Sequence, residues 1–312
     1  MVRLIVAAIA LATVLPVAGS ARPFAQGAVN VAIFTLFLFY GMRLSRDQVW
    51  QGLGNHRLLV PLVIWVFGVM GLAGWLAWQG TGGIIPPALA MGFLYLGVLP
   101  STIQSATLYS SLAGGNIASS VVAAALLNIL GVFLTVPLYS LLAGGADNVL
   151  SGQTLMKVLT ILLLPFVLGQ ALQKYTGEWV ARHRPKIALM DKGVIALGVY
   201  VAFSGAVEQG IWSQLEPDVW MVVLIACGLL LLLAYGGVWL LSGMLRLSRP
   251  DRIAMLFAGG QKSIAMGAPL ATVMFPAAIA GTVLLPLLVY HLSQMIVAAV
   301  MAGLLARGGA DG

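Results

Sequence analysis

The sequence predicts an all-α membrane protein of ten transmembrane helices, arranged as two inverted five-helix repeats. Of its residues, 61% are hydrophobic and only 8% are charged, against roughly 25% charged residues in a soluble globular domain. Residues 58–146 contain no Asp, Glu, Lys or Arg, and an apolar run of that length has to hold several membrane spans. Most basic residues lie in the short segments that separate the apolar runs.

Counting about 20 apolar residues for each span, we expect ten spans separated by turn-forming residues. They are residues 4–19, 27–42, 58–78, 84–113, 117–144, 154–172, 187–208, 219–243, 252–276 and 277–305. Five spans in each half force the second half to run inverted relative to the first. We therefore expect residues 1–146 to form the first repeat and residues 147–312 to form the second.

The first apolar segment has a second interpretation. Its basic start, apolar stretch and small-residue end are also typical of a cleavable signal peptide. We keep it as the first span because the charge pattern is then consistent at both termini.

The distribution of basic residues predicts a protein of the bacterial inner membrane with both termini in the cytoplasm. In this orientation 13 of the 16 basic residues fall on the cytoplasmic side, as the positive-inside rule requires. They are Arg3, Arg43, Arg46, Arg57, Lys174, Arg182, Arg184, Lys186, Lys192, Arg246, Arg249, Arg252 and Arg307.

Several classes of function are disfavoured. The net charge of +7 comes from short loops rather than from a basic face with interleaved aromatic residues, so no nucleic-acid partner is expected. The single cysteine, Cys227, lies in an apolar run and cannot form a disulfide framework. There is no GxxxxGK[ST] or HExxH motif and no carboxylate in mid-span, so we expect neither an ATPase nor another enzyme. A membrane sensor without transport activity remains an alternative.

Two of the predicted spans look breakable in the middle. Residues 84–113 contain Pro100 followed by the polar stretch STIQSAT, and residues 252–276 contain GGQKS at 259–263. Non-helical backbone at membrane depth is tolerated where it lines a cavity or is buried in protein. Paired broken spans in corresponding places of two halves mark the binding site of a secondary transporter.

Three segments carry a resemblance to the bile acid:sodium symporter superfamily, in particular to the branch of sodium/bile acid cotransporter 7 and its prokaryotic relatives. They are FLFYGMRLS (37–45), LPSTIQSATLYSSLAGGN (99–116) and FAGGQKSIAMGAPLATVMF (257–275). The resemblance implies that spans four and nine cross in a core domain of spans 3–5 and 8–10, beside a panel domain of spans 1–2 and 6–7. We expect a monomer or a homodimer in the lipid bilayer.

The resemblance implies sodium ligands, because coupled members use a Ser-Asn pair in span four, two hydroxyls in span five and a Glu-x-x-x-Gln-Asn stretch in span nine. The residues that keep this pattern are Ser105, Ser119 and Gln261. The residues that replace it are Ala106, Ala123, Phe257 and Lys262. Na⁺ is thus the only cofactor that the resemblance implies, and these replacements argue against a dual sodium site.

Lys262 is the most informative residue of the sequence. It follows Arg252 by ten residues, which places it about 15 Å deep in a hydrocarbon core roughly 30 Å thick. A lysine there costs about 2.5–3.5 kcal/mol on insertion scales. Three interpretations stay open: an ammonium satisfied by carbonyls at a helix break, a fixed cation that holds the crossing and attracts an anion, or a proton-coupling group.

Neutral polar residues accompany Lys262 at the two breaks and near them. We expect them either to satisfy freed backbone groups or to coordinate a substrate carboxylate or a single Na⁺. They are Gln104, Ser105, Thr107, Asn116, Ser119, Ser120, Asn128, Gln261 and Ser263. His291 is the only histidine within a span, and it is either a hydrogen-bonded packing residue or a proton-sensitive cavity residue.

These observations together predict a secondary active transporter that moves a small organic anion by alternating access. Coupling to sodium is the least supported part, because Lys262 and Phe257 stand where the family has cation-site residues. The alternatives are a proton-coupled carrier and an uncoupled carrier that uses Lys262.

Overall fold

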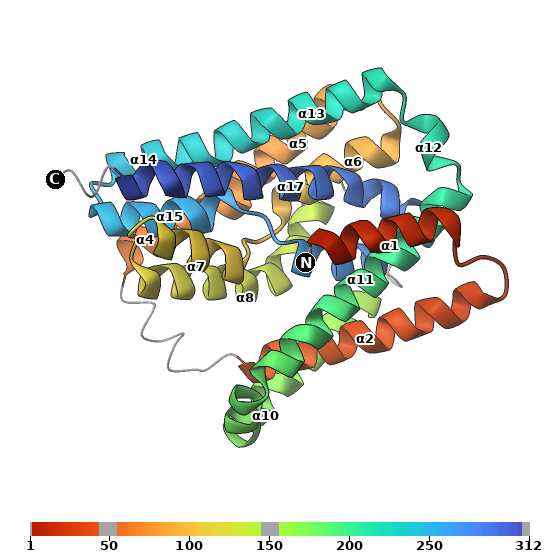
Figure 1. Ribbon diagram of the computed structural model, residues 1–312, viewed down its shortest axis with the longest axis horizontal. Coiled ribbons are helices and arrows are strands. Elements are labelled where there is room, and N and C mark those ends of the chain that lie inside the picture. The colour runs from red at the N-terminus through yellow and green to blue at the C-terminus, as the bar shows by residue number, and fades with distance from the viewer. Residues whose placement is uncertain (1, 44–54, 145–155, 308–312) are drawn as a thin grey trace.

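The computed structural model describes residues 2–43, 55–144 and 156–307. Within these ranges every element is a helix and no strand is present. Seven helices are long and apolar enough to cross a membrane, and the number is eight if one bent pair counts as a single span. The predicted all-α, multi-pass membrane architecture is therefore confirmed (Figure 1).

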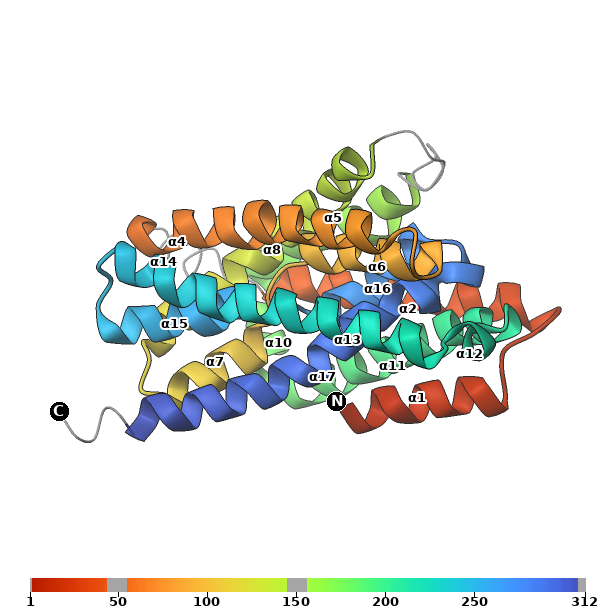
Figure 2. The same ribbon diagram turned by 90° about the horizontal axis from the view of Figure 1, so that it is seen from above.

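Most of the helices run along the long axis of the molecule, as Figures 1 and 2 show. The first half comprises α1 (Val2–Val14), α2 (Ala21–Arg43), α4 (His56–Val63), the π-helix η1 (Ile64–Val69), α5 (Met70–Thr81), α6 (Pro87–Val98), α7 (Ile103–Leu112) and α8 (Ile117–Leu142). The second half comprises η3 (Leu159–Leu163), α10 (Leu164–Arg182), α11 (Arg184–Glu208), α12 (Ile211–Gln214), α13 (Pro217–Leu232), η4 (Leu233–Gly237), α14 (Val238–Met244), α15 (Arg249–Gly260), α16 (Ile264–Met274) and α17 (Ala277–Arg307).

The first predicted span, residues 4–19, is shorter in the structure. Helix α1 ends at Val14 after 13 residues, a length of about 20 Å at 1.5 Å per residue. Pro16 explains the early end, because a proline disfavours helical backbone at the residue before it. Helix α1 packs against α11, and the hydroxyl of Tyr200 donates to the carbonyl of Leu15 at 2.8 Å.

The sixth predicted span, residues 154–172, is longer in the structure. One continuous helix runs from Met156 through the π segment η3 and α10 to Arg182. Hydropathy ends the predicted span early, because polar residues such as Lys174 follow, but no helix breaker occurs there. The helix ends where Pro185 occupies the first turn of α11, a position that suits proline at a helix start.

Helix α11 packs against α1, α2 and α10, and α2 packs against α10, so these four helices form one side of the molecule, in the lower part of Figure 1. Two ion pairs join α2 to α11 near opposite ends. Arg22 lies 2.8 Å from Glu208, and Arg43 lies 2.7 Å from Asp191. The remaining long helices form a second group, which α11 contacts through α16 and α17.

Helices α5 and α6 approach closely at two glycines. A Cβ built at Gly97 would lie 2.6 Å from the carbonyl oxygen of Met70 and 2.9 Å from the Cα of Gly74. Small residues let two backbones come this near in a membrane protein. The contact holds the carboxyl end of α6 against the helix that begins with α4 and η1.

Candidate functional site

The two predicted breaks are present, and they touch. Residues 99–102 separate α6 from α7, which are bent by 60° relative to each other. Residues 261–263 separate α15 from α16. The amide of Ser263 donates to the carbonyl of Pro100 at 2.9 Å. We call these two interrupted segments together the crossing.

Proline and glycine explain why both helices stop here. Pro100 pushes the residue before it away from helical backbone, and Leu99 is extended, with φ −72° and ψ 147°. In the other segment Gly259 and Gly260 lower the helical preference, and Gln261 is extended at φ −98° and ψ 149°.

Lys262 lies at the centre of the crossing with no exposed surface. Its ammonium donates to the carbonyls of Gly97 at 2.7 Å, Leu99 at 2.8 Å and Val66 at 3.2 Å. Gly97 and Leu99 belong to the carboxyl end of α6, which carries a partial negative charge. Val66 belongs to the π-helix η1. No carboxylate of the described residues forms an ion pair with this lysine.

The backbone of Lys262 is held by Gln294 of α17. The Gln294 side chain accepts from the Lys262 amide at 2.8 Å and donates to the Lys262 carbonyl at 3.0 Å. Its Nε2 also lies 2.8 Å from Nδ1 of His291, which fits an accepting Nδ1. Two polar side chains of α17 therefore lie at the crossing.

The other residues of the ninth-span break are also engaged. Ser105 of α7 donates a hydrogen bond to the Gln261 side chain. Ser263 caps α16 by accepting from the amide of Met266 at 3.2 Å. Tyr290 donates to the carbonyl of Gly260 at 2.8 Å. Two other helices, α7 and α17, thus bind this region through side chains.

In the fourth-span break, Asn128 of α8 forms hydrogen bonds with backbone carbonyls. Its amide donates to the carbonyl of Ser101 and to that of Ala124, each at 2.8 Å. The buried hydroxyls of Thr107 and Ser120 have no hydrogen-bond partner among the described residues, and Gln104 is exposed.

Asn116 and Ser119 lie apart from the crossing, although we grouped them with it from the sequence. The Asn116 amide donates to Oδ1 of Asp251 at 2.9 Å, and the Ser119 hydroxyl donates to the same oxygen at 3.0 Å. Asp251 precedes Gln261 by ten residues, or roughly 15 Å along α15. In this structure Ser119 is thus hydrogen-bonded to Asp251, whereas Ser105 is hydrogen-bonded to Gln261.

Two residues of this region were missed as site residues from the sequence. Gln294 carried a signal, because it lies one turn from His291 on a polar helix face. Asp251 gave no such signal, because a charged residue beside Pro250 is typical of a loop. The carbonyl of Val66 could not be predicted as an acceptor, because every residue has a backbone carbonyl whatever its side chain.

Comparison with known proteins identifies the family of this chain. The model of the SBF-like CPA transporter family matches residues 1–307. "Uncharacterized protein PA2026" of Pseudomonas aeruginosa is 36% identical over 307 residues, which cover 97% of this chain and 91% of that protein. "Putative symporter YfeH" of Escherichia coli is 36% identical over 302 residues, with coverage of 96% and 90%.

A more distant relative is "Sodium/bile acid cotransporter 7" of Mus musculus. It is 23% identical over 284 residues, which cover 87% of this chain and 81% of the mouse protein. The resemblance drawn from the three sequence segments is thereby confirmed. The chain belongs to the SBF-like CPA transporter family, a family of membrane transporters of the bile acid:sodium symporter type.

Proposed function

We propose that this chain is a secondary active transporter that carries a small organic anion across the bacterial inner membrane by alternating access. The observation that carries the proposal is the joining of two broken helices through the buried ammonium of Lys262. Membership of a transporter family supports transport, rather than catalysis or sensing, as the activity.

We further propose an internal architecture of two inverted repeats, residues 1–146 and 147–312. The bent pair α6–α7 and the broken pair α15–α16 hold corresponding places in the two halves, as paired discontinuous helices do in such transporters. The contacts of α11 with α1, α2 and α10, and of α2 with α10, support a panel domain of the first, second, sixth and seventh spans.

Lys262 acts in this proposal as a cation tethered to the protein. A protonated lysine has three N–H donors, whereas a neutral amine has two. Three carbonyl acceptors surround Nζ, so the geometry favours the charged form over the proton-releasing form. The ammonium thus stands at the position where the family resemblance expects a cation-site asparagine, and we propose that Na⁺ does not bind there.

The ammonium does not itself contact the substrate in this conformation. Gln261 and Lys262 have no exposed surface, and Ser263 has 2%. All three ammonium donors are already used. We therefore assign Lys262 to holding the crossing together and to offsetting the partial negative charge at the carboxyl end of α6.

The amino end of α7 is the best place for an anionic substrate group. Its cap residue Thr102 forms no side-chain capping bond, so the first amides of α7 are free to bind an anion. Gln104 is exposed and Ser105 is partly exposed on the first turn. The amino end of α16, by contrast, is already capped by Ser263.

Counterflow in liposomes tests the proposal. Purified protein is reconstituted and offered a panel of carboxylates and sulfonated steroids, and we expect at least one to exchange. Lys262→Ala should abolish that exchange, whereas Lys157→Ala, at an exposed lysine, should leave it unchanged. Folding is monitored by size-exclusion chromatography. Unchanged exchange in folded Lys262→Ala protein would refute the role of Lys262.

Coupling is tested separately with the substrate found in this way. Uptake is compared under inward sodium and proton gradients and in choline buffer at constant pH. The tethered cation predicts the same uptake with and without sodium. Stimulation of the wild-type protein by sodium, abolished when the gradient is collapsed, would overturn it.

A further inference from the structure

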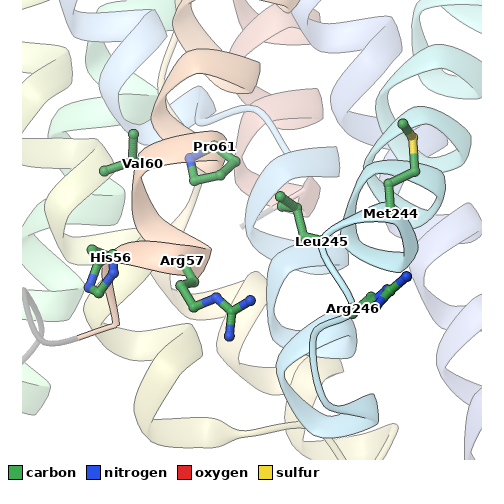
Figure 3. Close-up of a pocket in the computed structure, with 7 residues that line it drawn as sticks. All are labelled: His56, Arg57, Val60, Pro61, Met244, Leu245 and Arg246. Atoms are coloured by element: carbon green, nitrogen blue, oxygen red, sulfur yellow. The ribbon is translucent and has the colours of Figure 1, made fainter.

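A cavity of about 490 Å³ lies away from the crossing, between the start of α4 and the turn from α14 to α15 (Figure 3). One end is basic, with His56 and Arg57 on α4 and Arg246 on the turn. Arg57 and Arg246 belong to the group of basic residues that the sequence places on the cytoplasmic side. The cavity therefore opens where the headgroups of the inner leaflet lie.

Two arginines of this cavity have no side-chain partner within residues 2–43, 55–144 and 156–307. Neither Arg57 nor Arg246 forms an ion pair or side-chain hydrogen bond with another described residue. Their neighbour Arg252 differs, because its guanidinium stacks 4.1 Å from the centre of the Trp239 ring and donates to the Trp239 carbonyl at 3.3 Å. Two guanidinium groups are thus available to an external anion.

The backbone at Arg246 supports a role for this side chain. Arg246 has φ +52°, the only positive φ of a non-glycine residue in the described ranges. Its amide donates to Gly243, and the next amide, that of Leu247, donates to Ser242 at 3.2 Å. This is the helix-ending turn in which glycine is the usual residue at the left-handed position. The chain keeps an arginine where glycine would be unstrained, which points to a use for the guanidinium.

The walls of the cavity are apolar and continue into the membrane. Val60 on α4 and Met244 on α14 line it, and their exposed fractions are 57% and 80%. One turn deeper, Ile64 and Leu240 are also exposed. Exposed apolar residues aligned along two helices can pack against an acyl chain. They offer no favourable contact to a small soluble anion.

The groove between the two helices closes at depth. A Cβ built at Gly237 would collide with the ring of Trp65, so that ring packs directly on the η4 backbone. The groove is therefore charged at its entrance, apolar along its length and blocked at its end. A groove of this kind complements an amphiphilic molecule, which has a charged headgroup and an apolar chain.

We propose that this groove binds one anionic phospholipid. The phosphate lies between Arg57 and Arg246, and an acyl chain follows Val60 and Met244 towards the membrane interior. Basic pockets between membrane helices on the cytoplasmic side are suited to such headgroups. The bound lipid joins a helix of the first half of the chain to a helix of the second half.

Native mass spectrometry of the full chain tests the proposal with phosphatidylglycerol and phosphatidylcholine of identical acyl chains. We expect phosphatidylglycerol to be retained preferentially. Arg57→Gln and Arg246→Gly should each weaken its binding by roughly fivefold, the effect of one basic residue at a membrane surface. Arg184→Gln, at an exposed arginine on α11, is the matched control and should leave retention unchanged.

Arg246→Gly also separates lipid binding from folding. Glycine suits the left-handed backbone, so this variant should be as stable as the wild type in detergent without lipid while it loses stabilisation by phosphatidylglycerol. Equal retention of both lipids by the wild type would overturn the proposal. Stabilisation by inorganic phosphate as large as that by phosphatidylglycerol would overturn it too, because the site would then hold a soluble anion.

Discussion

The side chain of Gln294 binds the backbone of Lys262: it accepts a hydrogen bond from the Lys262 amide at 2.8 Å and donates one to the Lys262 carbonyl at 3.0 Å. A residue at a helix break loses its helical partners, and buried backbone groups need others. Helix α17 supplies both through one side chain. The direction in which the Lys262 side chain leaves the backbone is consequently set by a helix outside the two that cross.

Gln294→Leu removes both partners while keeping a similar volume. We expect a loss of about 1–3 kcal/mol of stability for the unsatisfied buried amide and carbonyl, measured by thermal unfolding in detergent. The matched control is Gln79→Leu, at an exposed glutamine, which should change stability little. If both variants unfold at the wild-type temperature, the two hydrogen bonds contribute nothing to the crossing.

The combined variant Phe257→Glu with Lys262→Asn restores the family pattern around the retained Gln261. It removes the tethered cation and adds a carboxylate, so we expect uptake that depends on sodium. The measurement is substrate uptake into liposomes in sodium and in choline buffer. Lys262→Asn alone is the control and should show no sodium response, because the carboxylate ligand is missing. Sodium-independent uptake by a folded double variant would count against a tethered cation.

Asp251→Asn tests whether the cluster with Asn116 and Ser119 belongs to the transport site. The carboxylate accepts from both side chains, so we expect a loss of about 1–2 kcal/mol of stability. Transport per folded molecule should stay at the wild-type level, because the cluster is far from Lys262. Asp218→Asn, also in the first turn of a helix, is the control. Abolished transport with intact folding would place Asp251 in the site.

Gly97→Ala should separate α5 from α6. The new Cβ would lie 2.6 Å from the Met70 carbonyl oxygen, and overpacking of this kind costs typically 1–3 kcal/mol, or about 2 kcal/mol here. The shift also moves a carbonyl that binds the ammonium, so transport should fall with stability. Gly228→Ala has no heavy atom within 4 Å of its Cβ and should be neutral or stabilising. Equal unfolding temperatures for both variants would contradict the close approach.

The sequence predicted the parts of this molecule that depend on residue type along one chain segment. Apolar runs showed the helices, and Pro100 and the glycines before Gln261 showed the breaks. Each of these is a local property. Hydropathy misplaced the end of a helix where the helix stopped at a proline, as before Pro16, or continued through polar residues, as beyond residue 172.

The contacts between segments could not be predicted in the same way. Asn116 and Ser119 have the chemistry of a binding site, but their partner is Asp251, a charge from the opposite half of the chain. The third acceptor of Lys262 is a carbonyl in a π-helix, and backbone oxygens are present at every residue. Only the folded arrangement selects which of them face the ammonium.

A positive charge that is covalently attached to the carrier changes the energetics of the cycle. A dissolved cation that accompanies an anion inward brings its own gradient and cancels the anion's charge, whereas Lys262 stays with the protein. An anion moved alone feels the full membrane voltage, about 2.3 kcal/mol per charge at 100 mV. With the cell interior negative, that voltage pushes a monovalent anion outward and sustains an outward concentration ratio of roughly fiftyfold. In the proposed cycle without a dissolved co-transported cation, this voltage therefore favours export of the anion.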